Sequence, residues 1–276
     1  MSLFWRWSDS MGPSRRWIVW HGDERLGWIG VGREGEEVHA RVEVDLAGAG
    51  PDAYAEAFAF AEGQAAELGA GSVVTDVWTD RAAALDALRS LGWKQRRHER
   101  FWRLELQPAK ERLAAELAGA REAAKGLSAV TAAEFGGESV FRTLYEINNQ
   151  TLLDVPRSIA FVPDPFELWM EWMSPPRSTP DRIWIGVADG APVGLSLLSY
   201  RPVGIVETGY TGVLREYRGR GLARLLKLET LVQAANLGVE AVETDNDSEN
   251  APIIHLNQAL GYSEITGQLE FAKSLV

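Results

Sequence analysis

The chain has 276 residues, of which 46% are hydrophobic and 24% are charged, and its formal net charge is −11. These numbers are those of an ordinary globular protein with one large domain or two small ones, and the acidic balance argues against DNA or RNA as a partner. No apolar run approaches the roughly 20 residues of a membrane helix, and the lack of cysteine excludes disulfides, zinc–thiolate sites and cysteine nucleophiles.

Apolar and β-branched residues predict a β-hairpin near the beginning of the chain. Its arms are Arg16 to Trp20 and Leu26 to Ile29. A similar hairpin is predicted much later, from Arg182 to Ile185 and from Val193 to Ser196. The two hairpins are the first sign that the chain contains one pattern twice.

The middle of the chain is predicted to be largely helical. Strong helix formers dominate residues 107–126, so we expect a helical linker that ends at Gly126. A strand should follow over Leu127 to Val130. Two further helices are predicted over 139–153 and 165–173, because each helical pattern is followed by proline.

The most informative stretch joins a strand to a helix through a glycine-rich turn. Residues 205–213 are β-branched and aromatic, and apolar residues recur at helical spacing over 222–237, before the expected C-cap Gly238. Such a junction gathers free N–H groups at the positive end of a helix, where phosphate commonly binds. Arg218 and Arg220 add guanidinium groups suited to a diphosphate, and the alternative is a tight turn with two solvated arginines.

A second motif follows a strand that should end near Thr244. A polar turn leads into a short helix opened near Asn250, and Leu260-Gly261-Tyr262 starts the next strand. Asparagine is a good N-cap and Pro252 suits a first helical turn. An ordinary capping role is therefore one interpretation of Asn250.

Together the two motifs resemble those of the GNAT N-acetyltransferases. Arg218-x-x-Gly221-x-Ala223 is similar to that family's acyl-CoA pyrophosphate loop, and Asn250 stands where the family's asparagine often contacts the pantetheine arm. The resemblance implies an α/β (α+β) protein with a mixed, mostly antiparallel central sheet flanked by helices, and acetyl-CoA as co-substrate. The acyl-CoA-binding residues that follow from it are Thr211, Gly212, Val213, Arg218, Gly219, Arg220, Gly221, Leu222, Ala223, Asn250 and Asn257.

The resemblance also suggests how an acetyl group would reach an amine. Glu207 stands at the family's frequent general-base position, and strict alternation along the strand would place it on one face with Thr211 and Val213. The alternative is an ordinary strand glutamate. Asn257 occupies the place of the family's frequent general-acid tyrosine, and an amide cannot deliver a proton. A second hypothesis is therefore a non-catalytic acyl-CoA-binding sensor or interaction module.

In the family, the two helices predicted over 139–153 and 165–173 form one wall of the acceptor site. The aromatic candidates for that wall, for which buried packing is the alternative, are Phe161, Phe166, Trp169 and Trp172. We expect the acceptor to be a small-molecule amine, which the acidic protein would attract as a cation; the alternative is that the acidity serves solubility.

The chain also repeats itself at a spacing of 169 residues. Leu68-Gly69, Thr75-Asp76 and Leu91-Gly92-Trp93 each recur at that spacing, the last as Leu260-Gly261-Tyr262. Three landmarks without an insertion indicate a duplicated unit.

The first copy lacks the residues that the second would use. At the same spacing Ala49, Asp52 and Tyr54 replace Arg218, Gly221 and Ala223, and Val38 replaces Glu207. We therefore predict a degenerate domain over 1–106, the linker over 107–126 and an acyl-CoA-binding domain over 127–276. On this division, a fragment of residues 127–276 should keep the site with reduced stability.

The sequence also bears on metal binding and on cellular location. The four histidines form no set with metal-ligand spacing, so we expect no metal site. The first residues lack the apolar core of a signal peptide, so we expect a cytoplasmic protein.

Overall fold

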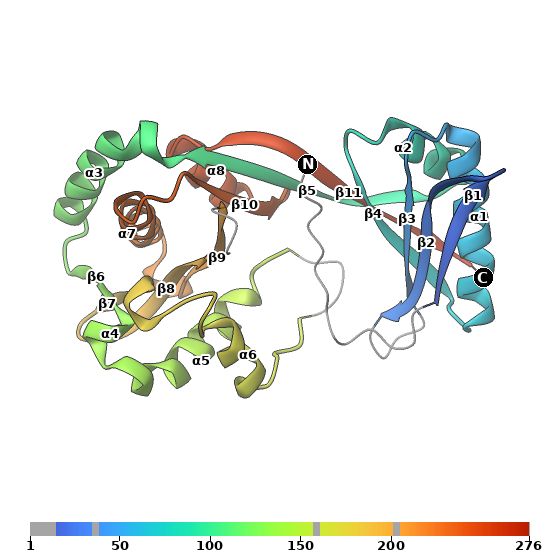
Figure 1. Ribbon diagram of the computed structural model, residues 1–276. Helices are drawn as coiled ribbons and strands as arrows, with labels where there is room; N and C mark the ends of the chain where they lie inside the picture. Colours follow the sequence, from blue (N-terminus) through green and yellow to red (C-terminus); the bar gives the residue numbers. More distant parts are fainter. Residues whose placement is uncertain (1–14, 35–38, 157–160, 201–204, 276) are drawn as a thin grey trace. The chain divides into compact units, whose positions relative to one another are not determined.

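The computed structural model describes residues 15–34, 39–156, 161–200 and 205–275, which divide into two compact units (Figure 1). Unit 1 contains the residues before Arg100 together with those from Thr266 onward, and unit 2 runs from Arg100 to Ile265. Each unit is a mixed sheet with helices, as the sequence predicts. None of the described helices is long and apolar enough to span a membrane.

Unit 1 is a sheet with two helices packed on one face. Its first three strands are antiparallel neighbours, the helix α1 crosses over to a parallel fourth strand, and the last strand of the chain pairs antiparallel with that fourth strand. The elements are β1 Arg15–His21, β2 Glu24–Glu34, β3 His39–Leu46, α1 Pro51–Glu67, β4 Ser72–Trp78, α2 Ala82–Ser90 and β5 Lys94–Glu105.

Period-2 alternation explains the core of unit 1. Ala40, Val42 and Leu46 on β3 are buried toward α1 and α2, where they join Phe58 and Leu88. The hairpin predicted from 16 to 29 is the β1–β2 pair.

Unit 2 has its strands in the order β5-β10-β9-β8-β7-β6. Strands β6 to β9 pair antiparallel, and α7 crosses over from β9 to the parallel β10. The elements are α3 Leu106–Ala123, β6 Leu127–Thr131, α4 Ala132–Phe135, the 3₁₀ turn η1 Gly137–Val140, α5 Phe141–Leu152, α6 Phe166–Trp172, η2 Pro180–Arg182, β7 Ile183–Ala188, β8 Ala191–Tyr200, β9 Ile205–Val213, η3 Arg215–Tyr217, α7 Leu222–Asn236, β10 Ala241–Asp247, α8 Ala251–Ala259 and β11 Ser263–Ser274.

The sheet of unit 2 is covered on both faces. One core lies between the sheet and the helices α3 and α7, and it contains Val206, Val242 and Leu226. The other lies on the opposite face, where Leu195 and Leu197 pack against α5 and α6. Because α7 lies between the sheet and α3, it is buried nearly all round, and Arg121 of α3 makes a bidentate ion pair, 2.7 Å on each side, with its buried Glu229.

The duplication is visible in the elements themselves. The strand β4, the helix α2 and the strand β5 begin and end 169 residues before β10, α8 and β11. The crossover helices α1 and α7 each follow a strand that is parallel to the next. The spacing read from three sequence landmarks is therefore that of whole elements.

The boundaries between the units differ from those predicted at 106 and 127. The strand β5 begins in unit 1 and ends in unit 2, while β11 begins in unit 2 and ends in unit 1. Trp102 and Leu104 enter the core of unit 2, whereas Leu269 and Phe271 enter the core of unit 1. The helix predicted as a linker is α3, and its apolar face belongs to unit 2.

Candidate active site

The two parallel strands of unit 2 diverge beside the glycine-rich turn. Over the described residues, β9 and β10 pair at three positions only, ending at Glu207 and Glu243, although β9 continues to Val213 and β10 to Asp247. On its other edge β9 stays paired with β8 from Val206 to Val213, with one irregularity at Gly209. The divergence gives the backbone of Thr208 to Val213 an edge turned toward β10 that a ligand can use.

A β-bulge changes the direction of the side chains on β9. Tyr210 pairs with Leu197 and Thr208 with Leu198, so Gly209 is the extra residue. Glu207 therefore shares a face with Tyr210 and Gly212, the face packed on α5, whereas Thr211 and Val213 point to the α7 side. The prediction that Glu207, Thr211 and Val213 share one face was wrong, because strict alternation does not allow for the bulge.

Tyr210 covers the backbone at Gly212. Its hydroxyl lies 2.8 Å from Thr151 Oγ1 of α5, and since Thr151 donates its own proton to Ile147 O at 2.7 Å, Tyr210 is the donor. A Cβ on Gly212 would lie 2.6 Å from both Thr151 Oγ1 and the Tyr210 ring. Glycine at 212 is therefore a steric requirement of this face, which the sequence motif alone does not show.

Four more residues predicted to bind acyl-CoA, two on β9 and two at the start of α7, have side chains that pack within the protein. Thr211 Oγ1 lies 2.8 Å from Ser196 Oγ, and Val213 is buried on the α7 side. Leu222 is also buried and packs against Gly186, and Ala223 packs against the same core. These four residues can contact a ligand through backbone groups, while their side chains stabilise the fold.

The loop between β9 and α7 has the geometry of an anion site. Gly219 and Gly221 have φ of +73° and +83°, the left-handed region that favours glycine. The first bond into the helix runs from Leu225 N–H to Gly221 O at 3.0 Å, so the amides of Leu222 and Ala223 precede it. A Cβ at either glycine would meet no atom within 4 Å, so the loop is open.

Arg218 anchors this loop. Its Nε donates to Val213 O at 2.8 Å, and its Nη2 lies 2.7 Å from Asp154 Oδ2. Arg215 binds the same carboxylate, and its hydrogen bonds, followed by those of Arg218, lower the pKa of Asp154 to about 2. Asp154 directly follows the helix predicted over 139–153 and was not identified from the sequence. Arg220 lies 5.7 Å over the ring of Tyr217.

The two predicted asparagines have different surroundings. Asn250 occupies the N-cap position of α8 but makes no side-chain capping bond, so the capping interpretation is not what the structure shows. Asn257 is fully buried, and its Nδ2 donates to Asn246 Oδ1 of β10 at 2.6 Å. Its position on α8 is held by β10, beside the divergence of the strands.

Three buried polar atoms near this divergence make no hydrogen bond of good geometry within the described part of the chain, although two of them, the Thr208 and Tyr262 hydroxyls, interact with each other. They are Thr208 Oγ1, Asn257 Oδ1 and the hydroxyl of Tyr262. Burial raises the pKa of Tyr262, and the nearby Thr208 hydroxyl opposes this rise. Because buried polar groups are normally hydrogen-bonded, Asn257 Oδ1 fits a ligand or water that brings a donor between the strands.

A buried lysine lies on the same side of the sheet. Lys227 of α7 is 2% exposed, and its Nζ lies 5.4 Å from the centre of the Tyr262 ring. Burial lowers the pKa of Lys227 to about 8.

Replacing Lys227 by Met should raise the free energy of unfolding by about 1–3 kcal/mol at pH 7, because the desolvation of the ammonium is removed. Since the folded pKa lies below the unfolded one, the parent gains stability as pH rises from about 8 to 10.5, and the difference should shrink there. Urea unfolding at pH 7 and 9.5 measures this, with Lys125→Met at an exposed position as control. A gain of equal size at both pH values, or a loss of stability at pH 7, would contradict it.

Unit 1 carries a different structure at the corresponding place. Its loop spans four residues, 47–50, against eight, 214–221, and its helix begins with Pro51, which has no N–H, and the acidic Asp52. The hydroxyl of Tyr54 donates to Leu46 O at 2.9 Å and so occupies the backbone acceptor at the end of β3. No anion site of the unit 2 kind is built here.

The counterpart of Glu207 in unit 1 is Arg41. The parallel pairs 39–41 with 72–74 correspond to 205–207 with 241–243, which aligns Arg41 with Glu207 and Val74 with Glu243. The constant spacing of 169 residues predicts Val38 as the counterpart of Glu207, and Val38 lies outside the described residues. The shorter loop explains the change of register.

The two helices predicted for the acceptor wall are present as α5 and α6. Phe166 and Trp169 pack in the core beneath them, and Trp172 is 49% exposed with Arg177 over its ring at 3.9 Å. Phe161 lies before α6. Buried packing therefore accounts for Phe166 and Trp169, and Trp172 is the wall candidate with an accessible ring.

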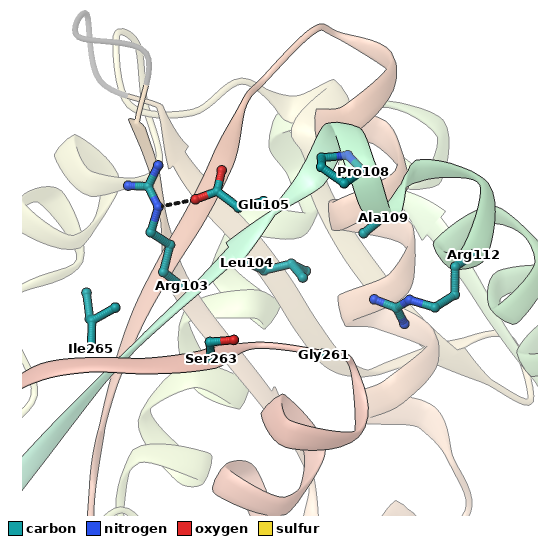
Figure 2. Close-up of a pocket in the computed structure, with 9 residues that line it drawn as sticks. All are labelled: Arg103, Leu104, Glu105, Pro108, Ala109, Arg112, Gly261, Ser263 and Ile265. Carbon is teal, nitrogen blue, oxygen red and sulfur yellow. Dashed lines mark hydrogen bonds and ion pairs between the residues drawn. The ribbon is translucent and has the colours of Figure 1, made fainter.

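A separate pocket of about 450 Å³ lies where β5 meets α3 (Figure 2). Arg112 there donates to Leu260 O at 2.8 Å, and Arg103 donates to Glu105 at 2.6 Å. None of the residues predicted for acyl-CoA lines it. The lining residues are Arg103, Leu104, Glu105, Pro108, Ala109, Arg112, Gly261, Ser263 and Ile265.

Comparison with known proteins points to the same part of the chain. Residues 142–262 match the model of the acetyltransferase (GNAT) family. No curated protein matches the chain.

Solved structures share the fold across both units. A GCN5-related N-acetyltransferase from Sphaerobacter thermophilus is 21% identical with a TM-score of 0.72, over 92% of this chain and 78% of that one. A tandem GNAT protein from the clavulanic acid biosynthesis pathway is also 21% identical, with a TM-score of 0.67, over 96% and 83%. A GNAT-family acetyltransferase from Colwellia psychrerythraea is 11% identical with a TM-score of 0.58, over 93% and 84%.

Proposed function

We propose that unit 2, which contains the residues 142–262 that match the model of the acetyltransferase (GNAT) family, transfers an acetyl group from acetyl-CoA to the amine of a small molecule. The observation that carries the proposal is the divergence of β9 and β10 beside the open glycine loop at the start of α7. The same place in unit 1 has neither the loop nor the carboxylate.

The residues present fit acyl-CoA. The amides from Gly219 to Ala223 would hold the diphosphate, since they lie at the positive end of α7. The buried Thr208 Oγ1 and Asn257 Oδ1 offer hydrogen-bonding groups to the amides of a pantetheine arm between the strands. Asn250, whose side chain does not cap α8, would contact the same arm.

Glu207 is the proton acceptor in this proposal. A free alkylamine has a pKa of about 10.4, so an acceptor arrives as an ammonium and must lose a proton. The ammonium gives this proton to Glu207, and the neutral amine nitrogen then bonds to the thioester carbonyl carbon. The C–S bond breaks with its electron pair on sulfur, and the second proton that the nitrogen loses passes to water. Backbone N–H groups on the free edge of β9 are the donors available to the developing oxyanion.

The leaving group does not require Asn257 as an acid. An ordinary thiol has a pKa of about 8.5, so a thiolate can depart at neutral pH and take its proton from water. Acetyl-CoA supplies the activated thioester when bound, and the protein supplies position, the base and the oxyanion donors.

Arg218→Ala should weaken CoA binding about tenfold or more, because charge-assisted hydrogen bonds contribute roughly 1.5–3 kcal/mol. Titration calorimetry measures this, with Arg215→Ala as the matched control, since Arg215 shares Asp154 but lies in η3, before the two glycines of the loop. Equal losses in both variants would mean that Arg218 acts only by holding Asp154, and no loss in Arg218→Ala would remove it from the site.

The function is tested by measuring thiol release from acetyl-CoA with a broad panel of primary amines. The proposal predicts turnover with at least one class of amine and one acetylated product per thiol released. Tight acyl-CoA binding without turnover for any amine would instead favour the sensor or interaction module.

A further inference from the structure

Four polar side chains form a row across unit 2, from β8 to β5. Ser199 pairs with Glu207, Glu207 pairs with Glu243, and Arg103 donates through Nη1 to Glu243 Oε1 at 2.8 Å. Glu207 and Glu243 are direct neighbours on parallel strands, whose backbones lie about 4.8 Å apart. The chain therefore places two carboxylates side by side.

The row lies on one face of the sheet. Val206 and Val242 precede the two glutamates and are buried on the α7 side, and Trp102 and Leu104 flank Arg103 in the same core. Alternation then turns Glu207, Glu243 and Arg103 to the opposite face. That is the face which carries Tyr210 and packs on α5.

Arg103 compensates the second carboxylate. The side chain of Glu243 is 15% exposed, so its charge is poorly screened by water, and the guanidinium lies against it. Arg103 also donates through Nε to Glu105 Oε1 at 2.6 Å, an interaction drawn in Figure 2. Arg103 is thus held by Glu105 and by Glu243, and Glu243 lies next to the proposed base Glu207.

We propose that Glu243 and Arg103 are positioning residues of the transfer site, which together set the charge that Glu207 experiences. The inference rests on the function proposed above. A neighbouring carboxylate favours the protonated form of Glu207, while a guanidinium favours its ionised form. The pair therefore sets the pH above which Glu207 is ready to accept a proton.

Other groups near Glu207 form a constant background. Ser199 on β8 is neutral, and Tyr210 on β9 donates to Thr151. Asp245 follows Glu243 on the same face of β10, as Glu105 follows Arg103 on β5. On α5, Arg142 lies 3.6 Å over the Phe166 ring, Tyr145 donates to Asp164 O, and Glu146 is the remaining ionisable side chain. None of these changes in the variants below.

The test is the titration of the Glu207 carboxyl by ¹³C NMR in the full chain, with its signal assigned through Glu207→Gln. Glu243→Gln should lower the titration midpoint by about one pH unit, because a negative neighbour is lost and Arg103 remains. Arg103→Gln should raise the midpoint by a similar amount. The control is Arg100→Gln, on the same strand as Arg103. It breaks the pair of Arg100 with Glu264 of β11 and should leave the midpoint unchanged.

Opposite shifts in the two variants support the inference, and shifts in one direction or no shift would overturn it. The pH at which kcat/KM is half-maximal should move with the NMR midpoint once an acceptor amine is in hand. Because NMR does not depend on turnover, a failure of the proposed function appears as absent activity, while a failure of this inference appears as unmoved midpoints.

Discussion

Glu207→Gln is expected to lower kcat about 10²–10⁴-fold at neutral pH, the range that general-base catalysis supplies. The carboxylate lies at the divergence of β9 and β10, on the face that carries Tyr210. The amide keeps the shape of the side chain but cannot accept the ammonium proton. Affinity for CoA should change little, because the glycine loop and α7 are untouched.

The pH dependence separates this role from a structural one. As pH approaches about 10.4 the acceptor amine loses its proton in solution, so the deficit of Glu207→Gln should shrink. Glu249→Gln, at an exposed position before α8, serves as the control and should retain parental kcat. If Glu207→Gln keeps full activity, Glu207 is an ordinary strand glutamate and not the proton acceptor.

A fragment of residues 127–276 is expected not to fold cooperatively, in contrast to the milder loss that the sequence suggests. It lacks all of β5 and α3, and the core of unit 2 therefore loses a set of large buried side chains. Each such loss costs about 2–5 kcal/mol, against a total stability of about 5–15 kcal/mol. The missing side chains are Trp102, Leu104, Leu106, Leu113 and Leu117.

Removing α3 also leaves a buried carboxylate unpaired. Glu229 loses its bidentate partner Arg121, and an uncompensated buried charge is costly. A fragment of residues 100–265 keeps the core and the ion pair, and it ends where β11 leaves unit 2. Circular dichroism during heating should show a cooperative transition for 100–265 and none for 127–276. A cooperative transition in both at the same temperature would contradict the division described here.

The sequence predicts much of this fold because its strongest signals are local. The glycine turn and the helix that follows it depend on residues close together in the chain, and the repeat at 169 residues is found by matching short local motifs. All three features are present. The predicted helices over 139–153 and 165–173 are α5, with the turn before it, and α6.

Features that depend on pairing between distant segments could not be read in this way. The bulge at Gly209 is defined by its partner β8, and the exchange of β5 and β11 between the units is defined by which strands they join. Asp154 gains its role from Arg215 and Arg218, about sixty residues away. Such contacts leave no periodic signal in a single sequence.

The central claim is that acyl-CoA binds unit 2 alone, through the loop that contains Gly221. The most direct measurement is titration calorimetry of the full chain with CoA, for the parent, Gly221→Val and Gly48→Val. Both glycines have positive φ, but Gly48 lies in the shorter loop of unit 1. The account predicts one site per chain, an affinity at least about tenfold weaker in Gly221→Val because valine is strained at that φ, and parental binding in Gly48→Val. Two equivalent sites per chain, or a loss confined to Gly48→Val, would contradict it.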